Sequence, residues 1–330
     1  MINTYTRSFD ELREAFELSI EKFTDFPESP KGLNEPIKYI MEIGGKRIRP
    51  LLVLLACDIY KGEFQEALKP ALAIEMFHNF TLMHDDIMDE APLRRGVPTV
   101  HNKYNVNTAI LSGDVMLIYA YRLLEGLSGD KFKKIFDVFN EAAIKVCEGQ
   151  QFDMNFEDET EVEIEAYLKM IELKTAVLLG CSLQVGAIVG GASNEDVNKL
   201  YEFGKNVGVA FQLQDDILDT FGDEKSFGKQ IGGDILQNKK TYLLLKTREL
   251  ASEEDRAVID DWFSREEFDP KEKIATITEI YNKYNILDLG NDLKHQYTEQ
   301  AFTDLNETSL SDAQKEPLNQ IANKLLKRVS

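Results

Sequence analysis

Apolar side chains recur at three- and four-residue spacing along most of this chain. The pattern begins in FDELREAFELSIEKF, residues 9–23, and predicts an amphipathic helix there. The same spacing predicts further helices over residues 71–89, 132–154, 167–190 and 197–223. Apolar and polar residues do not alternate over any useful length, as they would in a half-buried strand. We therefore predict an all-α fold.

Glycine and proline residues mark the expected ends of these helices. Gly44-Gly45 should stop one helix, and a new helix is expected after Pro50. Residues 175–191 are almost wholly apolar, which is typical of a helix buried on all sides in a large bundle. No linker rich in Ser, Gly or Pro interrupts the chain, so we expect a single domain over residues 1–330.

Composition restricts the classes of partner. Hydrophobic residues make up 43% of the 330 residues, enough for a sizeable core, and the formal net charge is −20. This charge argues against nucleic acid or an anionic membrane surface as a general partner. It does not exclude an anionic small molecule, because a local basic cluster or a bound cation can override the overall field.

The cysteines, the N-terminal sequence and the length of the apolar runs indicate the cellular compartment. Cys57, Cys147 and Cys181 are widely spaced among apolar residues, so we expect reduced core thiols in a cytoplasmic protein. The first residues lack the basic and apolar regions of a signal peptide. No run reaches about 18 apolar residues, so no membrane span is expected.

Aspartate residues form the motif D-D-x-x-D twice, at residues 85–89 and 215–219. On a helix, the first and last aspartates of each motif lie on one face, with about 5–6 Å between their β-carbons. Such carboxylates suit Mg²⁺, which usually completes its coordination with water and substrate phosphates. One copy alone is equally well explained as a solvated charge cluster. Two copies, each within an apolar helical stretch, favour a metal-dependent anion site.

Basic residues accompany both motifs. They are Arg94 and Arg95 after the first motif, Lys229, Lys239 and Lys240 after the second, Lys46, Arg47 and Arg49 in GGKRIRP, and Lys174 within an apolar run. Taken singly, GGKRIRP could be a solvated surface loop, and Lys174 could be a snorkelling side chain or part of a core ion pair. Taken together with the carboxylates, these cations indicate phosphorylated ligands and bridging metals.

The chain resembles the trans-polyprenyl diphosphate synthases, the family of farnesyl and geranylgeranyl diphosphate synthases. The matching motifs cover about residues 36–250, in the order GGKRIRPLLVLLA, LMHDDIMDEAPLRRGVPTVH, GDVML, EGQQFD, KTAVLL, GVAFQLQDDILDTFGD and FGKQIGGDILQNKKTYLLL. Two complete aspartate motifs in this order are highly specific.

The resemblance implies the isoprenoid synthase fold, a large helical bundle around a central active-site cavity, usually as a cytoplasmic homodimer. It implies head-to-tail condensation of isopentenyl diphosphate with dimethylallyl, geranyl or farnesyl diphosphate, dependent on Mg²⁺, with three ions expected. The metal-binding residues it implies are Asp85 and Asp89 for two ions and Asp215 for a third, supported by Asp86, Asp216 and Asp219.

The resemblance also implies the substrate-binding residues. Those for the allylic diphosphate are Arg94, Lys174, Lys229 and Lys239. Those for isopentenyl diphosphate are Lys46, Arg49, His78 and Arg95. Thr175 and Gln212 should line the reacting centre, so that the implied catalytic residues are Lys174, Thr175, Gln212, Asp85 and Asp215.

Residues just before the first motif are expected to set the product length. In the family, an aromatic residue five positions before the motif and a smaller one at four resemble geranylgeranyl (C20) synthases. Phe80 and Thr81 occupy these places, and Phe77 could provide a second stop. We therefore expect a C20 product first and farnesyl (C15) next.

Three alternatives remain to be compared. A terpene cyclase shares one D-D-x-x-D motif but typically has a different second metal motif. A non-catalytic subunit of a heteromeric synthase usually loses aspartates or the paired arginines, and this chain keeps them. A di-iron bundle needs two E-x-x-H motifs, and only Glu75 to His78 provides one.

Overall fold

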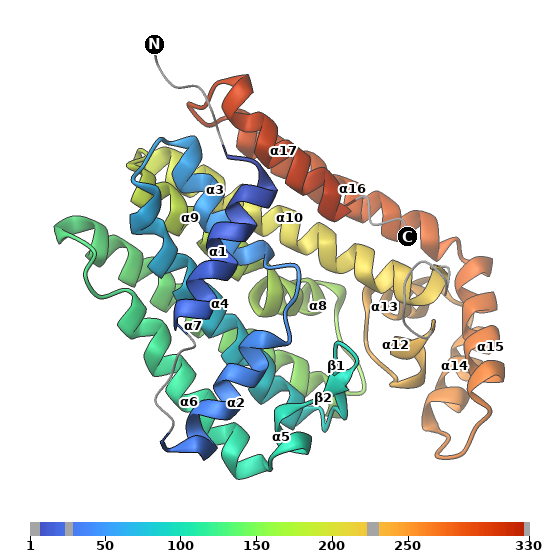
Figure 1. The fold of residues 1–330 in the computed structure, drawn as a ribbon. Helices are drawn as coiled ribbons and strands as arrows, with labels where there is room; N and C mark the ends of the chain where they lie inside the picture. The colour runs from blue at the N-terminus through green and yellow to red at the C-terminus, as the bar shows by residue number, and fades with distance from the viewer. Residues whose placement is uncertain (1–6, 24–28, 223–230, 327–330) are drawn as a thin grey trace. The chain divides into compact units, whose positions relative to one another are not determined.

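The described part of the chain is almost wholly helical (Figure 1). The computed structural model describes residues 7–23, 29–222 and 231–326. Its one described strand pair is short and antiparallel, β1 (Leu93–Arg94) with β2 (Val97–Pro98). The predicted all-α class is confirmed.

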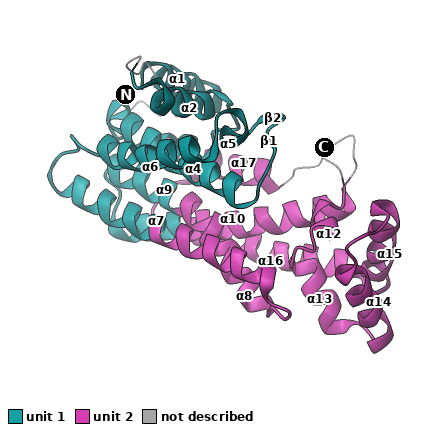
Figure 2. Cartoon of the chain, turned by 90° about the horizontal axis from the view of Figure 1, so that it is seen from below, with its two compact units in different colours: residues 1–143, 181–201 teal, residues 144–180, 202–330 magenta. Residues whose placement is uncertain are grey.

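The chain divides into two compact units, residues 1–143 with 181–201 and residues 144–180 with 202–330 (Figure 2). The helices of the first unit are α1 (Phe9–Phe23), α2 (Lys31–Glu42), α3 (Ile48–Ile59), α4 (Phe64–Met88), α5 (Val100–Lys103) and α6 (Val106–Leu123). Three helices contain unit boundaries, namely α7 (Gly129–Asp158), α9 (Val177–Gly190) and α10 (Asn194–Phe221).

The second unit continues with shorter helices. They are α8 (Ile164–Ile171), the π-helical turn η1 (Glu172–Ala176), α12 (Gly233–Leu236), α13 (Tyr242–Leu250), α14 (Glu253–Ser264), α15 (Pro270–Lys283), α16 (Ile286–Asn306) and α17 (Asp312–Leu326). Its core gathers apolar side chains from α8, α10, α13 and α15, including Tyr167, Leu213, Leu243 and Ile277.

Helix α4 is the central element of the first unit, in contact with α1, α2, α3, α5 and α6. Its middle is buried on nearly all sides, as its high apolar content dictates. Helix α1 is amphipathic instead and buries Leu12, Phe16 and Ile20, with the ends that the sequence predicted. The first aspartate motif therefore sits at the end of a helix fixed by packing around it.

One predicted helix start was wrong. Helix α3 begins at Ile48 rather than after Pro50. Proline is compatible with the first turn of a helix, because the first N–H groups have no intrahelical partner there. Pro50 therefore sits inside the helix that it was expected to precede.

The cysteine prediction was right for two of three residues. Cys57 and Cys181 are buried, whereas Cys147 is exposed. The reason is the periodicity of α7, which turns Ile144 and Glu148 outward on the same side as Cys147. Apolar neighbours in sequence did not amount to burial at this position.

The continuous helical run from Ile164 to Gly190 is long and apolar enough to cross a membrane by length and composition alone. Within the structure, 83% of its most apolar 18 residues are buried. A core helix of a water-soluble protein has the same properties, so this run is weak evidence for a span.

Candidate active site

The first aspartate motif occupies the last turn of α4. Asp89 caps the helix, and its N–H donates to the carbonyl oxygen of Asp85 at 2.9 Å, which holds the two residues on one face. Asp89 is exposed and Asp85 is half-buried, while Asp86 is buried at 2% exposure. The neighbouring aspartates thus point into different surroundings.

Arg94 returns to this helix end from β1. Its Nε donates to both Oδ1 and Oδ2 of Asp86 at 2.8 Å, and its Nη2 lies 3.6 Å from Oδ2 of Asp85. Burial raises the pKa of Asp86, an effect that the hydrogen bonds and charge of Arg94 oppose. Asp86 therefore anchors the arginine, which remains 23% exposed.

Three of the predicted isopentenyl diphosphate ligands form a cationic cluster within the first unit. Nη1 of Arg49 lies 3.2 Å from Nε2 of His78. An arginine only donates, so this imidazole nitrogen must accept, and His78 is neutral. Burial, Arg49 and then Arg95 lower the pKa of His78 well below its ordinary value.

The surroundings of Arg49 in this cluster disfavour its positive charge. Burial lowers its pKa to about 10, with the charge of Arg95 adding to the effect and Glu75 opposing it. Its Nε atom is buried and has no hydrogen-bond partner within the described ranges. An anion beside Arg49 and Arg95 would reduce the repulsion between the two guanidinium groups. It would also offer a hydrogen-bond acceptor to Arg49.

The Gly44-Gly45 loop is shaped around Arg95. A Cβ atom on Gly45 would lie 2.7 Å from Nη1 of Arg95, and the φ of Gly45 is +142°. The backbone conformation therefore disfavours a side chain at this position, and a Cβ would also require the flexible guanidinium end of Arg95 to move. Lys46 follows on the same loop and is exposed, so the predicted ligand set comes from neighbouring positions of one unit.

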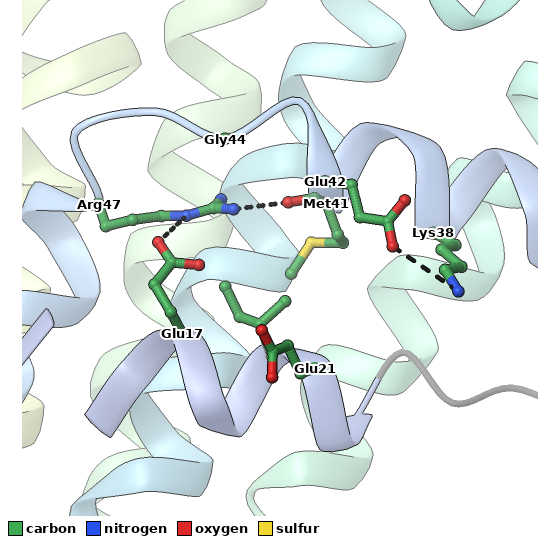
Figure 3. A pocket seen from close by; sticks show the side chains of 8 residues that line it. Glu17, Glu21, Lys38, Met41, Glu42, Gly44 and Arg47 are labelled. Carbon is green, nitrogen blue, oxygen red and sulfur yellow. Dashed lines mark hydrogen bonds and ion pairs between the residues drawn. The ribbon is translucent and has the colours of Figure 1, made fainter. Parts of the chain in front are cut away.

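Arg47, by contrast, is a structural residue. Its Nη1 lies 2.6 Å from Oε1 of Glu75, and its Nη2 donates to the carbonyl oxygen of Met41 at 2.5 Å. Figure 3 shows Arg47 reaching Met41 and Glu17 beside a pocket of about 360 Å³. Since Glu75 also accepts from Nδ2 of Asn79 at 3.1 Å, it is already engaged, which disfavours the di-iron alternative.

The second aspartate motif occupies the end of α10. Asp216 is 5% exposed and accepts a hydrogen bond from the hydroxyl of Tyr167 and one from Nε2 of Gln212 at 3.2 Å. Burial and the charge of Asp234 raise the pKa of Asp216 to about 8. Asp215 and Asp219 are only half-buried. Gln212, predicted at the reacting centre, is held by this carboxyl group.

Asp234 is a site residue that the motif search missed. Its N–H donates to Oδ2 of Asp219 at 2.9 Å, and its Oδ1 lies 3.6 Å from Nζ of Lys239. Gly232 turns the chain with a φ of +78° and donates its N–H to the carbonyl oxygen of Asp219 at 2.6 Å. The signal available in the sequence was the Gly-Gly-Asp turn shortly after the motif.

Lys174 lies in η1, a π-helical turn between α8 and α9, with Thr175 half-buried beside it. Its Nζ is 2.6 Å from Oδ2 of Asp153, so an ion pair is present as considered from the sequence, but it is partly exposed rather than in the core. A Cβ on Gly149 would come within 2.2 Å of the backbone nitrogen of Lys174. Gly149 and Asp153, one helical turn apart on α7, thus adjoin the backbone and side chain of Lys174. π-Bulges frequently occur at functional sites.

The other lysines after the second motif differ. Lys229 lies outside the described residues. Lys240 donates from Nζ to the carbonyl oxygens of Phe156 and Glu157, the latter at 3.2 Å, and so fastens the end of α7. Lys239, by contrast, has a mostly exposed side chain that lies beside Asp234.

The predicted length-determining residues form an aromatic group. The ring of Phe77 is buried, with its centroid 5.7 Å from that of Phe80 and 5.4 Å from that of Phe139. Phe80 also lies 4.8 Å from the ring of His84. Thr81 donates from its hydroxyl to the carbonyl oxygen of His78 at 2.8 Å.

The donor set fits a hard divalent cation. The candidate ligands of both motifs are carboxylates, and hard cations such as Mg²⁺ prefer oxygen. Among residues 7–23, 29–222 and 231–326, no three His, Cys, Asp or Glu side chains gather around one point. A cation here would complete its coordination with water and substrate oxygens, as Mg²⁺ usually does.

Comparisons with known proteins agree with this chemistry. The family model described as Polyprenyl synthetase matches residues 30–282. A geranylgeranyl diphosphate synthase of Sulfolobus acidocaldarius is 39% identical over 301 residues, 90% of this chain and 91% of the relative. A geranylfarnesyl diphosphate synthase of Natronomonas pharaonis is 37% identical over 252 residues, 71% of this chain and 74% of the relative. A crystal structure of a geranylgeranyl pyrophosphate synthase superposes with a TM-score of 0.93 at 42% identity, covering 98% of this chain and 100% of that one.

Proposed function

The chain belongs to the polyprenyl synthetase family, and we propose that it condenses isopentenyl diphosphate head-to-tail with allylic diphosphates. It is a prenyltransferase, and its likeness to solved structures agrees with the isoprenoid synthase fold predicted from the sequence. The product of this reaction is a short-chain all-trans prenyl diphosphate.

One observation carries the proposal. In each aspartate motif the middle carboxyl group is buried and bonded within the protein, Asp86 by Arg94 and Asp216 by Tyr167 and Gln212. The first and last carboxylates of each motif keep some exposure. This repeated division supports oxygen ligands presented to a cation at both motifs, with the middle aspartate as the anchor.

Divalent metal dependence follows from the family, and we assign Mg²⁺, three ions, to Asp85, Asp89 and Asp215. When bound, Mg²⁺ would neutralise charge on the allylic diphosphate and make it a better leaving group. Arg94, Lys174 and Lys239 add positive charge for the same diphosphate, together with Lys229. Charge that develops on the leaving oxygen is thereby stabilised.

The cationic cluster of Arg49, His78 and Arg95, with Lys46, binds the second substrate. Its guanidinium groups bind and orient the diphosphate of isopentenyl diphosphate, which holds the double bond toward the allylic carbon. The allylic carbon–oxygen bond breaks, the 1'–4 carbon–carbon bond forms, and one proton leaves. The expelled diphosphate accepts that proton, while Thr175 and Gln212 supply dipoles at the reacting centre.

We propose a C20 main product, with C15 next. Phe80, with the smaller Thr81 after it and buried Phe77 behind it, supports this length. The relatives named geranylgeranyl synthases support it too. One relative is a geranylfarnesyl diphosphate synthase, so a C25 product is the alternative that product sizing must test.

We propose a cytoplasmic homodimer that acts as a single catalytic domain, without nucleic acid partners or a membrane span. The dimer is supported by α6, whose buried side faces α4. Its other side exposes apolar residues, namely Val106, Ile110, Leu111 and Ile118. Four exposed apolar side chains on one helix favour a protein partner over solvent, and a second copy satisfies this in a symmetric contact.

The test is incubation of the purified chain with isopentenyl diphosphate, Mg²⁺ and each allylic starter, followed by sizing of the extracted prenyl alcohols. We expect C20 alcohol to dominate with farnesyl diphosphate as starter, and no product in the presence of a chelator. A folded protein that condenses none of the starters would instead be a non-catalytic subunit, and the proposal would be wrong.

The metal assignment has its own variant. Asp85→Ala should lower turnover by at least about 100-fold, because a ligand of the leaving-group cation is lost. Its melting temperature should change little, since Asp85 is only half-buried. Asp137→Ala, which changes an exposed aspartate on α7, is the matched control. Equal loss of turnover in both variants would contradict the assignment.

A further inference from the structure

A buried lysine in α15 lies beside the segment that follows the second aspartate motif. The side chain of Lys273 is 0% exposed. Its Nζ donates to Oδ1 of Asn238 at 2.5 Å and lies 4.3 Å from the ring centroid of Phe268 and 5.0 Å from that of Phe263. Burying an ammonium group costs free energy, and aromatic faces compensate only in part. The hydrogen bond to Asn238 is therefore the specific interaction that this lysine provides.

Asn238 follows α12 in a left-handed backbone conformation. Its φ is +56°, a region that glycine adopts most readily and asparagine next, because the short polar side chain of asparagine can form local hydrogen bonds. Its Nδ2 donates to the carbonyl oxygen of Phe263 at 3.1 Å. The side-chain amide is thus fixed at both ends, the oxygen by Lys273 and the nitrogen by Phe263.

The residue after Asn238 is Lys239, one of the residues proposed to bind the allylic diphosphate. The N–H of Lys239 donates to the carbonyl oxygen of Asp234 at 2.9 Å, and its Nζ lies 3.6 Å from Oδ1 of Asp234. Asp234 in turn donates its N–H to Oδ2 of Asp219. Three residues, Asn238, Lys239 and Asp234, therefore connect Lys273 to Asp219, the last carboxylate of the second motif.

The other end of the same segment also meets α15. A Cβ on Gly232 would lie 2.7 Å from Cγ1 of Ile274, the residue next to Lys273. Helix α12, between Gly232 and Asn238, packs against α15. Two adjacent residues of α15 thus restrain both ends of the Gly232–Asn238 segment.

We propose that Lys273 is a positioning residue, which through Asn238 sets the placement of Lys239 and Asp234 for a metal-bound diphosphate. The proposal rests on the proposed function for the identity of the ligand, but the restraint itself does not. Lys273 touches no substrate, and it acts by limiting the conformations of residues 232–240 before the ligand arrives.

The first measurement is hydrogen–deuterium exchange in the ligand-free protein. Lys273→Met keeps a long unbranched side chain and removes the donor, and we expect the amides of residues 232–240 to exchange about tenfold faster, the scale of one lost charged hydrogen bond. Asn238→Gly keeps a residue suited to positive φ and removes the acceptor, so it should give the same increase. Lys271→Met, an exposed lysine of the same helix, is the control and should leave exchange unchanged.

The second measurement is steady-state kinetics. Lys273→Met should raise the KM for the allylic diphosphate about tenfold, which is typical when a supporting residue behind a ligand is lost. It should leave the KM for isopentenyl diphosphate unchanged, because Arg49, His78 and Arg95 belong to the other unit. The melting temperature should fall only slightly, because removal of the buried charge offsets most of the loss of the hydrogen bond to Asn238.

The outcomes separate the two proposals. If the parent protein condenses no starter, the proposed function fails while the exchange data still decide on the restraint. If the parent protein is active and neither exchange nor the allylic KM changes in either variant, the positioning role is wrong. A markedly lower melting temperature with both KM values raised equally would also overturn it, because that pattern indicates a purely structural lysine.

Discussion

Within each aspartate motif, neighbouring residues have different tasks because a helix turns by about 100° per residue. Asp86 and Asp216 point into the protein, where they accept hydrogen bonds from Arg94 and Tyr167. Asp85 and Asp215 keep part of their surface accessible. One carboxylate of each pair thus fixes the local structure, and its neighbour keeps the exposure that the proposed metal ligation requires.

His78 predicts a pH dependence of stability. Its pKa in the folded protein is lowered by burial and by Arg49, whereas in the unfolded chain it is about 6.5. Below pH 6.5 the unfolded state binds the extra proton, so this residue makes stability fall as the pH decreases, by up to about 1.4 kcal/mol per pH unit.

Urea denaturation at pH 7.5, 6 and 5 measures this contribution. His78→Gln should lose less stability on acidification than the parent protein. His295→Gln is the control, because His295 is exposed and beside Glu299. Parallel losses in the parent protein and both variants would show that His78 does not titrate as described.

Phe80 predicts the length of the product. Phe80→Ala should shift the products from C20 to C25 and longer, because it removes the ring nearest the first motif that packs on Phe77. Phe132→Ala, which removes a ring of α7 in contact with Phe136, is the matched control. Chromatography of the extracted alcohols measures the product lengths. An unchanged profile in Phe80→Ala would show that Phe80 does not limit the length of the product.

At the scale of elements, the close approach of α7 to η1 depends on Gly149. Gly149→Ala should destabilise the protein by about 1–3 kcal/mol, the usual cost of overpacking, because the new Cβ would overlap the backbone of Lys174. Turnover should fall as Lys174 shifts relative to Asp153. Gly32→Ala has open space in α2 and should be neutral. The denaturation midpoints of both variants measure this loss of stability. An unchanged midpoint for Gly149→Ala would contradict the close contact between Gly149 and the backbone of Lys174.

The sequence predicted the helices well and their partners poorly. Periodicity located α1 at both ends, and the repeated motif located both carboxylate clusters. Asp153 and Asp234 were missed because each is a single carboxylate, whose partner comes from another element or from beyond a turn. Cys147 was misplaced because local hydrophobicity does not reveal which side of α7 is covered. Such features depend on tertiary contacts, which local patterns do not encode.

At the scale of the molecule, the net charge of −20 coexists with a local cluster of arginines. Global charge describes long-range attraction, while recognition of a diphosphate depends on contacts within a few ångströms, and we propose Arg49 and Arg95 for those contacts. An acidic protein can therefore bind anionic substrates, provided that it carries fixed cations at the site.

The apolar side of α6 predicts the assembly state. The double substitution Leu111→Glu, Ile118→Glu should convert a dimer into a monomer of 37.6 kDa, because charge would be buried at the interface. Light scattering after size-exclusion chromatography measures the mass. Leu18→Glu alters an exposed leucine of α1 and should leave the dimer intact. A parent protein that is already monomeric would refute the assembly.

The exposed thiol on α7 makes this chain chemically addressable at one cysteine. Cys57 and Cys181 are buried, and the pKa of Cys57 is raised to about 12, so neither competes for reagents in the folded state. The pKa of Cys147 is also raised, by partial desolvation and by Glu148, so its thiolate is scarce near neutral pH. A maleimide probe should therefore attach to Cys147 alone, and faster as the solution is made mildly alkaline. The native sequence thus provides a labelling position without any substitution.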